Sequence, residues 1–314
     1  MFHHPKIRNA LLFFLVMAIT IFFIIGRESS HRQRDTIVEQ APIEAPDTYT
    51  PNELGVCTGR RWPADVPPLY VITPTYRRAE QIPELTRLAQ TLLLVDSLVW
   101  IVVDDADEPT PAVVNYLQER RICHVYLIAR MPAKFQKLKN PPRGVANRRK
   151  ALEWLRKHAK KGGAFYFADD DNTYDTRLLD EIRHTKKVSM FPVGLVTQLG
   201  LSSPIVRNGK IVGFYDGWIA NRKFPVDMAG FAVSVDFLNA RPEADMPFLV
   251  GQEETKFLES LNFTLDDVEL LSSNATTIRV WHTKTKKNNK AILGAKKLNY
   301  KDSNINFLQE QIWR

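Results

Sequence analysis

Short continuous apolar runs alternate with stretches of helical character between residues 69 and 168. The apolar runs are 69–73 (LYVIT), 99–103 (VWIVV), 125–128 (VYLI) and 164–168 (AFYFA). Because these runs are rich in β-branched and aromatic residues, they predict buried parallel strands. Helical stretches lie between them, notably at 85–94 and 146–159. This order predicts an α/β sheet with helices on its faces.

The second half of the chain has its apolar runs closer together. Residues 211–214 and 231–235 are the clearest of them. Their short spacing predicts a mixed sheet, in contrast to the parallel strands of the first half. The sequence has no internal repeat.

An apolar segment near the N-terminus predicts a membrane anchor. Residues 10–25 (ALLFFLVMAITIFFII) are almost wholly apolar, and their length is near the lower limit for crossing a bilayer. We expect residues 1–9 to be a cytoplasmic tail and residues 10–26 a transmembrane signal anchor. A cleavable signal peptide is the alternative, although Gly26-Arg27-Glu28 lacks the small residues of a cleavage site. The flanking basic residues leave the orientation open.

Two Asn-x-Thr tripeptides, at Asn262 and Asn274, are candidate glycosylation sites if the chain after the anchor is lumenal. They favour a type II topology, and the short span suits the thinner membranes of the early secretory pathway. Residues 27–68 are polar and rich in Pro, Glu and Thr, which predicts an extended lumenal stem. Cys57 in this stem is a candidate for a disulfide between two chains, with an internal bridge or a free thiol as the alternatives.

Composition excludes several classes of protein. The chain has 314 residues, 44% of them hydrophobic, and 43 basic against 35 acidic residues give a net charge of +8. This hydrophobic content excludes a disordered or collagen-like chain. Only two cysteines are present, so a disulfide scaffold and a four-thiolate zinc site are also excluded.

Acidic residues follow two of the predicted strands. Asp104-Asp105 ends the run at 99–103, and Asp169-Asp170-Asp171 ends the run at 164–168. Ligands of open α/β sheets bind beyond the carboxyl ends of the strands, so these are the first candidate binding residues. In an extended strand Asp169 and Asp171 would lie on one face and Asp170 on the other.

Three consecutive carboxylates need a compensating cation, since each close pair repels by a few kcal/mol at an effective dielectric of about 20. Mg²⁺ or Mn²⁺ is suited to such oxygen ligands and shares its coordination shell with substrate phosphates. A solvated acidic turn before a helix near Thr176 is the alternative. Arg143, Arg148 and their basic neighbours open the helix at 146–159, where the helix dipole also favours an anion. Most of the lysine-rich segment after Thr283 is expected to be a solvated tail.

Seven strings in one order resemble a single family, the β-1,3-glucuronosyltransferases of glycosyltransferase family 43. They are 73–76 (TPTY), 109–111 (PTP), 142–145 (PRGV), 166–174 (YFADDDNTY), 192–196 (PVGLV), 224–233 (FPVDMAGFAV) and 281–283 (WHT). The resemblance covers about residues 68–285. It implies a Golgi type II membrane enzyme that moves glucuronic acid from UDP-glucuronic acid to a terminal galactose with inversion.

The resemblance also implies a GT-A fold, preceded by the transmembrane helix. Residues 69–196 would form a Rossmann-like half that binds the UDP-sugar, and residues 197–314 a mixed-sheet half that binds the acceptor and ends in a tail. The expected partners are the UDP-sugar donor and a galactose-terminated glycan, with no nucleic acid. We also expect a membrane-anchored homodimer.

Residue roles follow from the resemblance position by position. Asp171 would bind Mn²⁺ at the diphosphate, and Tyr76 and Asp105 would stack on and hydrogen-bond to uracil. The acceptor-side positions are Trp218, Arg222 and Asp227. The full set of donor-binding positions is Pro74, Tyr76, Asp105, Arg143, Arg148, Asp169, Asp170, His282 and Lys284.

Glu254 is the expected catalytic base. We prefer it to Glu253 because Phe257 and Leu258 then follow at helical spacings of three and four, which would hold the carboxylate on the cleft side. Inversion requires one base, which removes the proton of the acceptor hydroxyl while a metal stabilises the departing UDP.

Two positions depart from the family pattern. Lys284 stands where well-known animal members carry Arg. A guanidinium that can donate two parallel hydrogen bonds to a phosphate or carboxylate is thus replaced by a single ammonium charge. Ser202 stands where an acceptor-binding Glu is expected, which removes two acceptor oxygens from that subsite. Donor choice and the sugar beyond the terminal galactose are therefore open.

Three rival hypotheses accompany glucuronic acid transfer to glycoproteins, glycolipids or the proteoglycan linker. The first is a transferase of the same fold with another UDP-sugar, such as UDP-xylose. The second is an inactive Golgi scaffold, and the third a glycan-binding module that uses the lysine-rich tail. The intact acidic triplet and Glu254 favour an enzyme over the scaffold.

Overall fold

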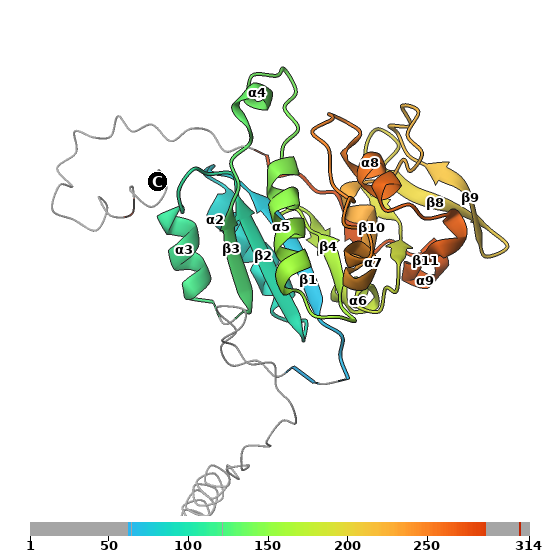
Figure 1. Ribbon diagram of the computed structural model, residues 1–314, viewed down its shortest axis with the longest axis horizontal. Helices are drawn as coiled ribbons and strands as arrows, with labels where there is room; N and C mark the ends of the chain where they lie inside the picture. The colour runs from blue at the N-terminus through green and yellow to red at the C-terminus, as the bar shows by residue number, and fades with distance from the viewer. Residues whose placement is uncertain (1–61, 64, 121, 287–307, 309–314) are drawn as a thin grey trace, which may run out of the picture. The chain divides into compact units, whose positions relative to one another are not determined.

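The computed structural model describes residues 62–63, 65–120, 122–286 and 308 (Figure 1). All of these belong to the unit that spans residues 46–314. The predicted tail, anchor and most of the stem, Cys57 included, lie outside the described residues. Within the described part of the chain, no helix is long and apolar enough to span a bilayer. Cys123 is buried and disulfide-bonded.

Seven strands of the described chain form one mixed sheet in the order β11-β6-β10-β4-β1-β2-β3. They are β1 (Leu69–Thr75), β2 (Leu98–Asp104), β3 (His124–Ile128), β4 (Ala164–Phe167), β6 (Val188–Met190), β10 (Phe231–Ser234) and β11 (Val268–Leu270). β1 pairs in parallel with β2 and β4, and β2 with β3, whereas β10 is antiparallel to β4 and β6. Strands β1 to β4 therefore end at the same edge of the sheet.

Helices cover both faces of this sheet, which confirms the predicted α/β class. The α-helices of the described chain are α2 (Gln81–Leu92), α3 (Pro111–Gln118), α4 (Ala133–Gln136), α5 (Val145–His158), α6 (Thr176–Ile182), α7 (Val235–Asn239), α8 (Glu253–Ser260) and α9 (Leu271–Ala275), of which α4 lies beyond the ends of the strands in Figure 1. Figure 1 shows α5 lying across the near face of the central strands. Successive side chains of a strand point to opposite faces. Tyr70 and Ile72 of β1 thus pack in the core beneath α5, and Leu69 and Val71 in the core with α2.

A second sheet of five strands lies in the described part of the chain, in the order β5-β12-β7-β8-β9. Its strands are β5 (Thr173–Tyr174), β7 (Val193–Gly194), β8 (Leu201–Arg207), β9 (Lys210–Tyr215) and β12 (Val280–Trp281). Both sheets include strands from before and after residue 196. The two predicted halves therefore share their sheets, and the separate binding role of each half stays a prediction.

The ends of the elements are set by local chemistry. Pro111 opens α3, where its missing N–H is not needed, and Asp175 caps α6 by accepting a hydrogen bond from the backbone N–H of Arg177. Asp104 ends β2 fully buried and accepts hydrogen bonds from the side chains of Thr110 and Tyr126, at 2.6 and 3.0 Å. Asp104 is thus part of the core, and only its neighbour Asp105 remains for binding.

An aromatic cluster attaches α8 to the main sheet. Phe257 is fully buried, and its ring centroid lies 6.4 Å from that of Phe165, 5.7 Å from Phe167 and 6.2 Å from Phe231. Residues three and four positions apart lie on one face of a helix, so Glu254 lies on the same face as Phe257. The cluster therefore sets where that carboxylate lies.

We expect Phe257→Ala to lower the free energy of unfolding by about 3–5 kcal/mol, because it removes a buried ring and leaves a cavity. Leu94→Ala is the matched control, since Leu94 is 76% exposed and its loss is worth about 0.5 kcal/mol or less. Urea denaturation of both variants measures the difference. Equal midpoints would show that the aromatic cluster does not hold α8.

Candidate functional site

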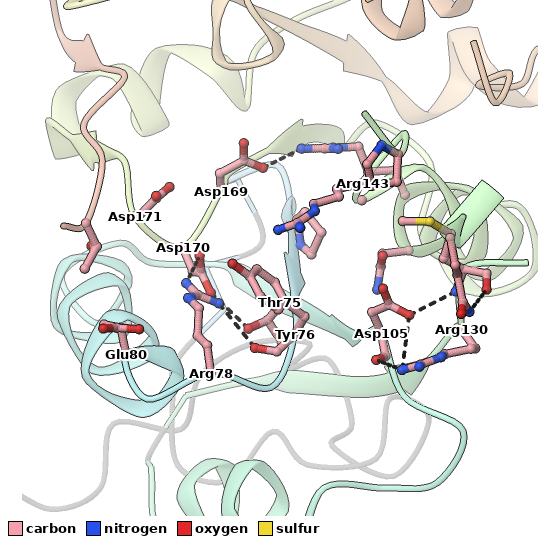
Figure 2. Close-up of a pocket in the computed structure, with 18 residues that line it drawn as sticks. Thr75, Tyr76, Arg78, Glu80, Asp105, Arg130, Arg143, Asp169, Asp170 and Asp171 are labelled. Atoms are coloured by element: carbon pink, nitrogen blue, oxygen red, sulfur yellow. Dashed lines mark hydrogen bonds and ion pairs between the residues drawn. The ribbon is translucent and has the colours of Figure 1, made fainter. Parts of the chain in front are cut away.

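A cavity of about 430 Å³ opens at the edge where β1, β2 and β4 end (Figure 2). Its lining includes seven of the nine predicted donor-binding residues together with the predicted metal ligand: Pro74, Tyr76, Asp105, Arg143, Arg148, Asp169, Asp170 and Asp171. The remaining two, His282 and Lys284, line a different cavity. We call the first the donor-side cavity.

All three carboxylates of the acidic triplet line the donor-side cavity. The expectation that Asp170 would lie on the opposite face from Asp169 and Asp171 is wrong, because β4 already ends at Phe167 and the chain turns at Asp170 and Asp171. The turn replaces the alternation of an extended strand and brings three negative charges together.

Arginines neutralise two members of the triplet. Arg148 of α5 forms an ion pair with Asp169, and Arg78 donates to Asp170 Oδ1 at 2.7 Å. Thr75 donates to the other oxygen of Asp170 at 2.9 Å, so each of its oxygens accepts one hydrogen bond from the protein. Burial raises the pKa of Asp170 to about 6, although Arg78 and Thr75 oppose this rise.

Asp171 differs from its neighbours because none of the described residues forms an ion pair with it. Burial and the nearby Asp169 raise the pKa of Asp171. Within the described chain, no group of three or more His, Cys, Asp or Glu side chains is placed to hold a metal ion by itself. A metal at this position would therefore have Asp171 and phosphate oxygens among its ligands, which is how Mg²⁺ and Mn²⁺ usually bind at nucleotide sites.

Tyr76 lies between two arginines at the cavity wall. The guanidinium carbon of Arg78 is 4.6 Å, and that of Arg143 5.5 Å, from the centroid of the Tyr76 ring. Figure 2 shows Asp105 beside Arg130, to the right of Tyr76 in that view. Asp105 Oδ1 accepts a hydrogen bond from the backbone N–H of Met131 at 2.9 Å. An aromatic ring and a fixed carboxylate therefore both line the cavity.

The N-terminus of α5 faces the same cavity. Gly144 precedes the helix with a φ of +76°, and a Cβ at this position would lie 2.4 Å from Arg148 Nη1. A side chain here would be strained by the left-handed φ and would displace the guanidinium of Arg148, so glycine is the residue best suited to this position. The free N–H groups of the first turn and the helix dipole make this corner suited to an anion such as a diphosphate.

Sequence reasoning missed Arg78 and Arg130 of this cavity. Arg78 lies two residues after Tyr76 in the string TPTYRR, and nothing in that spacing shows that its partner is Asp170, 92 residues later. A search for basic side chains just after each strand end would have identified both arginines as candidates. It would not have identified the carboxylates with which they pair.

A second cavity, of about 960 Å³, is lined by His282, Lys284 and Trp218 among others, and we call it the outer acceptor cavity. His282 Nδ1 lies 3.0 Å from Asp227 Oδ2, and this hydrogen bond raises the pKa of the histidine. Thr283 next to it donates to the backbone carbonyl of Asp171. The segment at 281–285 therefore connects the donor-side cavity with the outer acceptor cavity.

A third cavity, of about 160 Å³, is lined by Glu253, Glu254 and all three predicted acceptor-side residues, Trp218, Arg222 and Asp227. We call it the inner acceptor cavity. Ser202 lies next to this cavity and helps to fix one of its lining residues. Its hydroxyl accepts a hydrogen bond from the backbone N–H of Asp227 at 3.1 Å.

Glu254 has the properties of a proton acceptor at neutral pH. Its side chain is 19% exposed, and Arg222 Nη1 lies 3.7 Å from its Oε2. Burial raises the pKa of Glu254 to about 7, with Glu253 and Asp227 adding to the rise and Arg222 opposing it. A pKa near the working pH is what general base catalysis favours.

Arg222 is held almost entirely by protein groups. Its guanidinium donates to the backbone carbonyls of Trp218 and Val226 and to Asp216 Oδ1, the last at 3.0 Å. With only 5% of its side chain exposed, it can organise the cavity wall and face Glu254, but it has few free donors for a ligand. Its predicted contact with the acceptor stays a prediction.

Both predicted glycosylation sites are exposed. Asn262 follows the end of α8, and Asn274 lies in a stretch of left-handed backbone from Ser272 to Ala275, with φ of 54–59°. Attachment of glycans there stays a prediction.

Comparison with known proteins gives several matches. The model of glycosyltransferase family 43 matches residues 88–286. Galactosylgalactosylxylosylprotein 3-beta-glucuronosyltransferase P of Drosophila melanogaster is 51% identical over 251 residues, covering 79% of this chain and 52% of that protein. Galactosylgalactosylxylosylprotein 3-beta-glucuronosyltransferase 3 of Mus musculus is 43% identical over 248 residues, covering 72% of each. The chain thus spans about half the length of the Drosophila relatives it matches.

Among solved structures, TarS of S. aureus in complex with UDP-GlcNAc gives a TM-score of 0.45 at 13% identity, covering 72% of this chain and 62% of that one. The family match includes the acidic triplet, the N-terminus of α5, Glu254 and the segment at 281–285. Together with the identity to the mouse relative, it shows that the chain belongs to glycosyltransferase family 43.

Proposed function

We propose that this protein is an inverting glycosyltransferase of GT-A type that transfers glucuronic acid from UDP-glucuronic acid to the 3-hydroxyl of a terminal galactose. The acceptor would be a glycoprotein, a glycolipid or the proteoglycan linker. Support comes from the family and from the names of the Drosophila and mouse relatives, which are 3-beta-glucuronosyltransferases. The observation that carries the proposal is the position of the segment at 281–285 between the donor-side cavity and the outer acceptor cavity. The outer acceptor cavity shares lining residues with the inner acceptor cavity, which contains Glu254, a carboxylate of pKa about 7.

The donor would lie in the donor-side cavity. Uracil fits between the ring of Tyr76 and the carboxylate of Asp105, and the diphosphate fits the anion-binding corner formed by Arg143 and the N-terminus of α5. Asp169 and Asp170, each fixed by an arginine, would accept hydrogen bonds from sugar hydroxyls. His282 and Lys284 would reach the phosphates from the side of the outer acceptor cavity.

Mn²⁺ is the proposed cofactor, held by Asp171. This carboxylate fits a hard divalent cation because it lines the cavity without an ion pair among the described residues. The cation would neutralise charge on the departing diphosphate.

Glu254 would act as the general base. It removes the proton from the acceptor 3-hydroxyl, whose oxygen attacks the anomeric carbon of glucuronic acid as the bond to UDP breaks. One displacement inverts the anomeric configuration and gives a β linkage. Trp218 and Asp227 would orient the galactose beside Glu254, since they line the same cavity.

The location of the protein is also part of the proposal. We propose that residues 10–26 anchor it in the Golgi membrane as a single-pass type II protein and that it forms a homodimer. The apolar segment supports the anchor, and the Asn-x-Thr tripeptides at Asn262 and Asn274, which could carry glycans only in the lumen, support its orientation.

A panel of UDP-sugars with galactosyl-β-1,3-galactose and galactosyl-β-1,4-N-acetylglucosamine tests the function. We expect UDP-glucuronic acid to be the best donor by about tenfold or more, because its carboxylate can bind an arginine through charge-assisted hydrogen bonds. Product mass and radiolabel transfer measure the rates. A different sugar as the main product would instead favour the rival transferase, and no turnover with any donor would favour the inactive scaffold.

Replacing the base should slow the reaction strongly. We expect Glu254→Gln to lower kcat by roughly 10² to 10⁴, and Glu253→Gln, the matched neighbour, to stay near wild type. The wild-type rate should rise with pH and level off above about 7, because only the ionised Glu254 accepts a proton. Equal rates for the two variants would show that Glu254 is not the base.

A melting curve controls for misfolding of Glu254→Gln. The folded pKa lies above the unfolded value of 4.5, so the contribution of Glu254 to stability falls as pH rises from about 4.5 to 7. The neutral amide avoids this loss, and the variant at pH 8 should therefore melt no lower than wild type.

Metal dependence should reside in Asp171. We expect Mn²⁺ to tighten UDP binding by about tenfold or more relative to EDTA, and Asp171→Asn to remove most of this gain while retaining the metal-free affinity. Asp175→Asn is the control, because Asp175 caps α6 and pairs with Arg177. Calorimetric titration with UDP measures the affinities. The same manganese effect in wild type and Asp171→Asn would contradict the assignment.

A further inference from the structure

The two acceptor cavities share three lining residues, Thr197, Asp216 and Trp218. The outer acceptor cavity also contains His282, and the inner one contains Glu254. The shared residues therefore stand where a molecule that extends from one cavity into the other must pass. Of the three, only Trp218 already has a proposed role toward the acceptor, and Asp216 is the one that carries a charge.

Asp216 is a buried carboxylate directly after β9. Only 2% of its side chain is exposed. One oxygen, Oδ1, accepts hydrogen bonds from the backbone N–H of Trp218 at 2.7 Å and from Arg222 Nη2 at 3.0 Å. The other oxygen, Oδ2, is buried and has no hydrogen-bond donor among the residues that the structure describes.

A buried carboxylate oxygen without a donor is unusual and costs free energy, since more than nine-tenths of buried polar groups in folded proteins have partners. The two donors on Oδ1 fix the orientation of the carboxylate. Since Asp216 lines both cavities, a molecule bound there is one source of a donor for Oδ2.

A saccharide is suited to supply this donor. A carboxylate only accepts hydrogen bonds, and each sugar hydroxyl can donate one. The inner acceptor cavity also contains Asp227, Glu253 and Glu254 against the single Arg222, so its charge favours a neutral sugar over an acidic one. Trp218, with its side chain 56% exposed, offers an apolar face beside Asp216.

We propose that Asp216 is an acceptor-binding residue, whose Oδ2 accepts a hydrogen bond from a hydroxyl of a neutral, galactose-terminated acceptor. The proposal rests on the proposed function in that it takes the acceptor to be such a glycan. A site built to hydrogen-bond a hydroxyl discriminates strongly against analogues that lack it. Asp216 is thus a specificity-determining residue.

The same carboxylate connects the acceptor with the base. Asp216 Oδ1 holds Arg222, and Arg222 Nη1 lies 3.7 Å from Glu254 Oε2. A hydroxyl bound to Oδ2 therefore contacts a side chain that positions the arginine facing the base. The buried carboxylate of Asp216 would therefore both bind the acceptor and hold the arginine that faces Glu254.

The test is Asp216→Asn in the full-length protein. The amide keeps an oxygen for Trp218 and Arg222 and replaces Oδ2 by an N–H₂ group, which cannot accept. We expect the Kd for galactosyl-β-1,3-galactose or galactosyl-β-1,4-N-acetylglucosamine, titrated into the UDP-loaded protein, to rise about tenfold to a hundredfold. The Kd for UDP should stay within about twofold, since Asp216 does not line the donor-side cavity.

Asp236→Asn is the matched control, because Asp236 accepts a hydrogen bond from the backbone N–H of Gly162 and lines none of these cavities. It should change neither Kd. An unchanged acceptor Kd in Asp216→Asn overturns the proposal. So does an equal loss of acceptor and UDP affinity with a lower Tm, which would indicate a structural role only.

Acceptors that each lack one hydroxyl provide a second measurement that does not depend on how the variant folds. One of them should bind wild type about tenfold more weakly than the parent sugar, yet bind Asp216→Asn as well as the parent does. If every deoxy sugar loses the same factor with both proteins, Asp216 contacts none of these hydroxyls and the proposal is wrong.

These results are separable from those on the proposed function. A protein that binds galactosides in this Asp216-dependent way without transferring glucuronic acid refutes the proposed reaction and supports the role of Asp216. A protein that transfers glucuronic acid while Asp216→Asn keeps full acceptor affinity refutes the role of Asp216 alone. Wild type that binds neither disaccharide overturns the role of Asp216.

Discussion

The pairing of buried carboxylates with arginines is the interaction on which the rest of the site depends. Three aspartates follow one strand within a turn, and two unit charges 4 Å apart repel by about 4 kcal/mol at an effective dielectric of 20. Arg148 and Arg78 relieve this repulsion at Asp169 and Asp170. They come from different elements, so the ion pairs also bring α5 and the segment before α2 to the same cavity. The third carboxylate, Asp171, forms no ion pair with the described residues and lines the same cavity.

The inner acceptor cavity also brings carboxylates and an arginine together, but here the carboxylates outnumber the arginine. Four carboxylates and one arginine line the inner acceptor cavity. Burial raises the pKa of Glu254, and the nearby Glu253 and Asp227 add to this rise while Arg222 opposes it. The two sides are joined by hydrogen bonds of the segment at 281–285, through His282 to Asp227 and through Thr283 to Asp171. This segment therefore contacts residues of both the donor-side cavity and the inner acceptor cavity.

Much of the architecture was predictable because it follows from local pattern. The continuous apolar runs correspond to β1, β2, β3 and β4, and the acidic residues after them lie at the expected edge of the sheet. Runs of two or three residues, such as β5, β7 and β12, carry too few positions to show a period, so the second sheet was predicted only as a mixed region. The alternating faces expected for the acidic triplet failed because a turn at Asp170 ends the extended backbone.

The sequence by itself determined the α/β class, the strand ends that carry acidic residues and, through seven strings in order, the family. The tertiary structure decided which charges meet. Arg78 and Asp170 are 92 residues apart, and nothing local marks them as partners. It also decided that Asp104 is buried in the core while Asp105 faces the cavity, and that Asp216 has one occupied and one unpartnered oxygen. Periodicity and strand ends are properties of neighbouring residues, whereas burial and charge pairing depend on distances that exist only once the chain has folded.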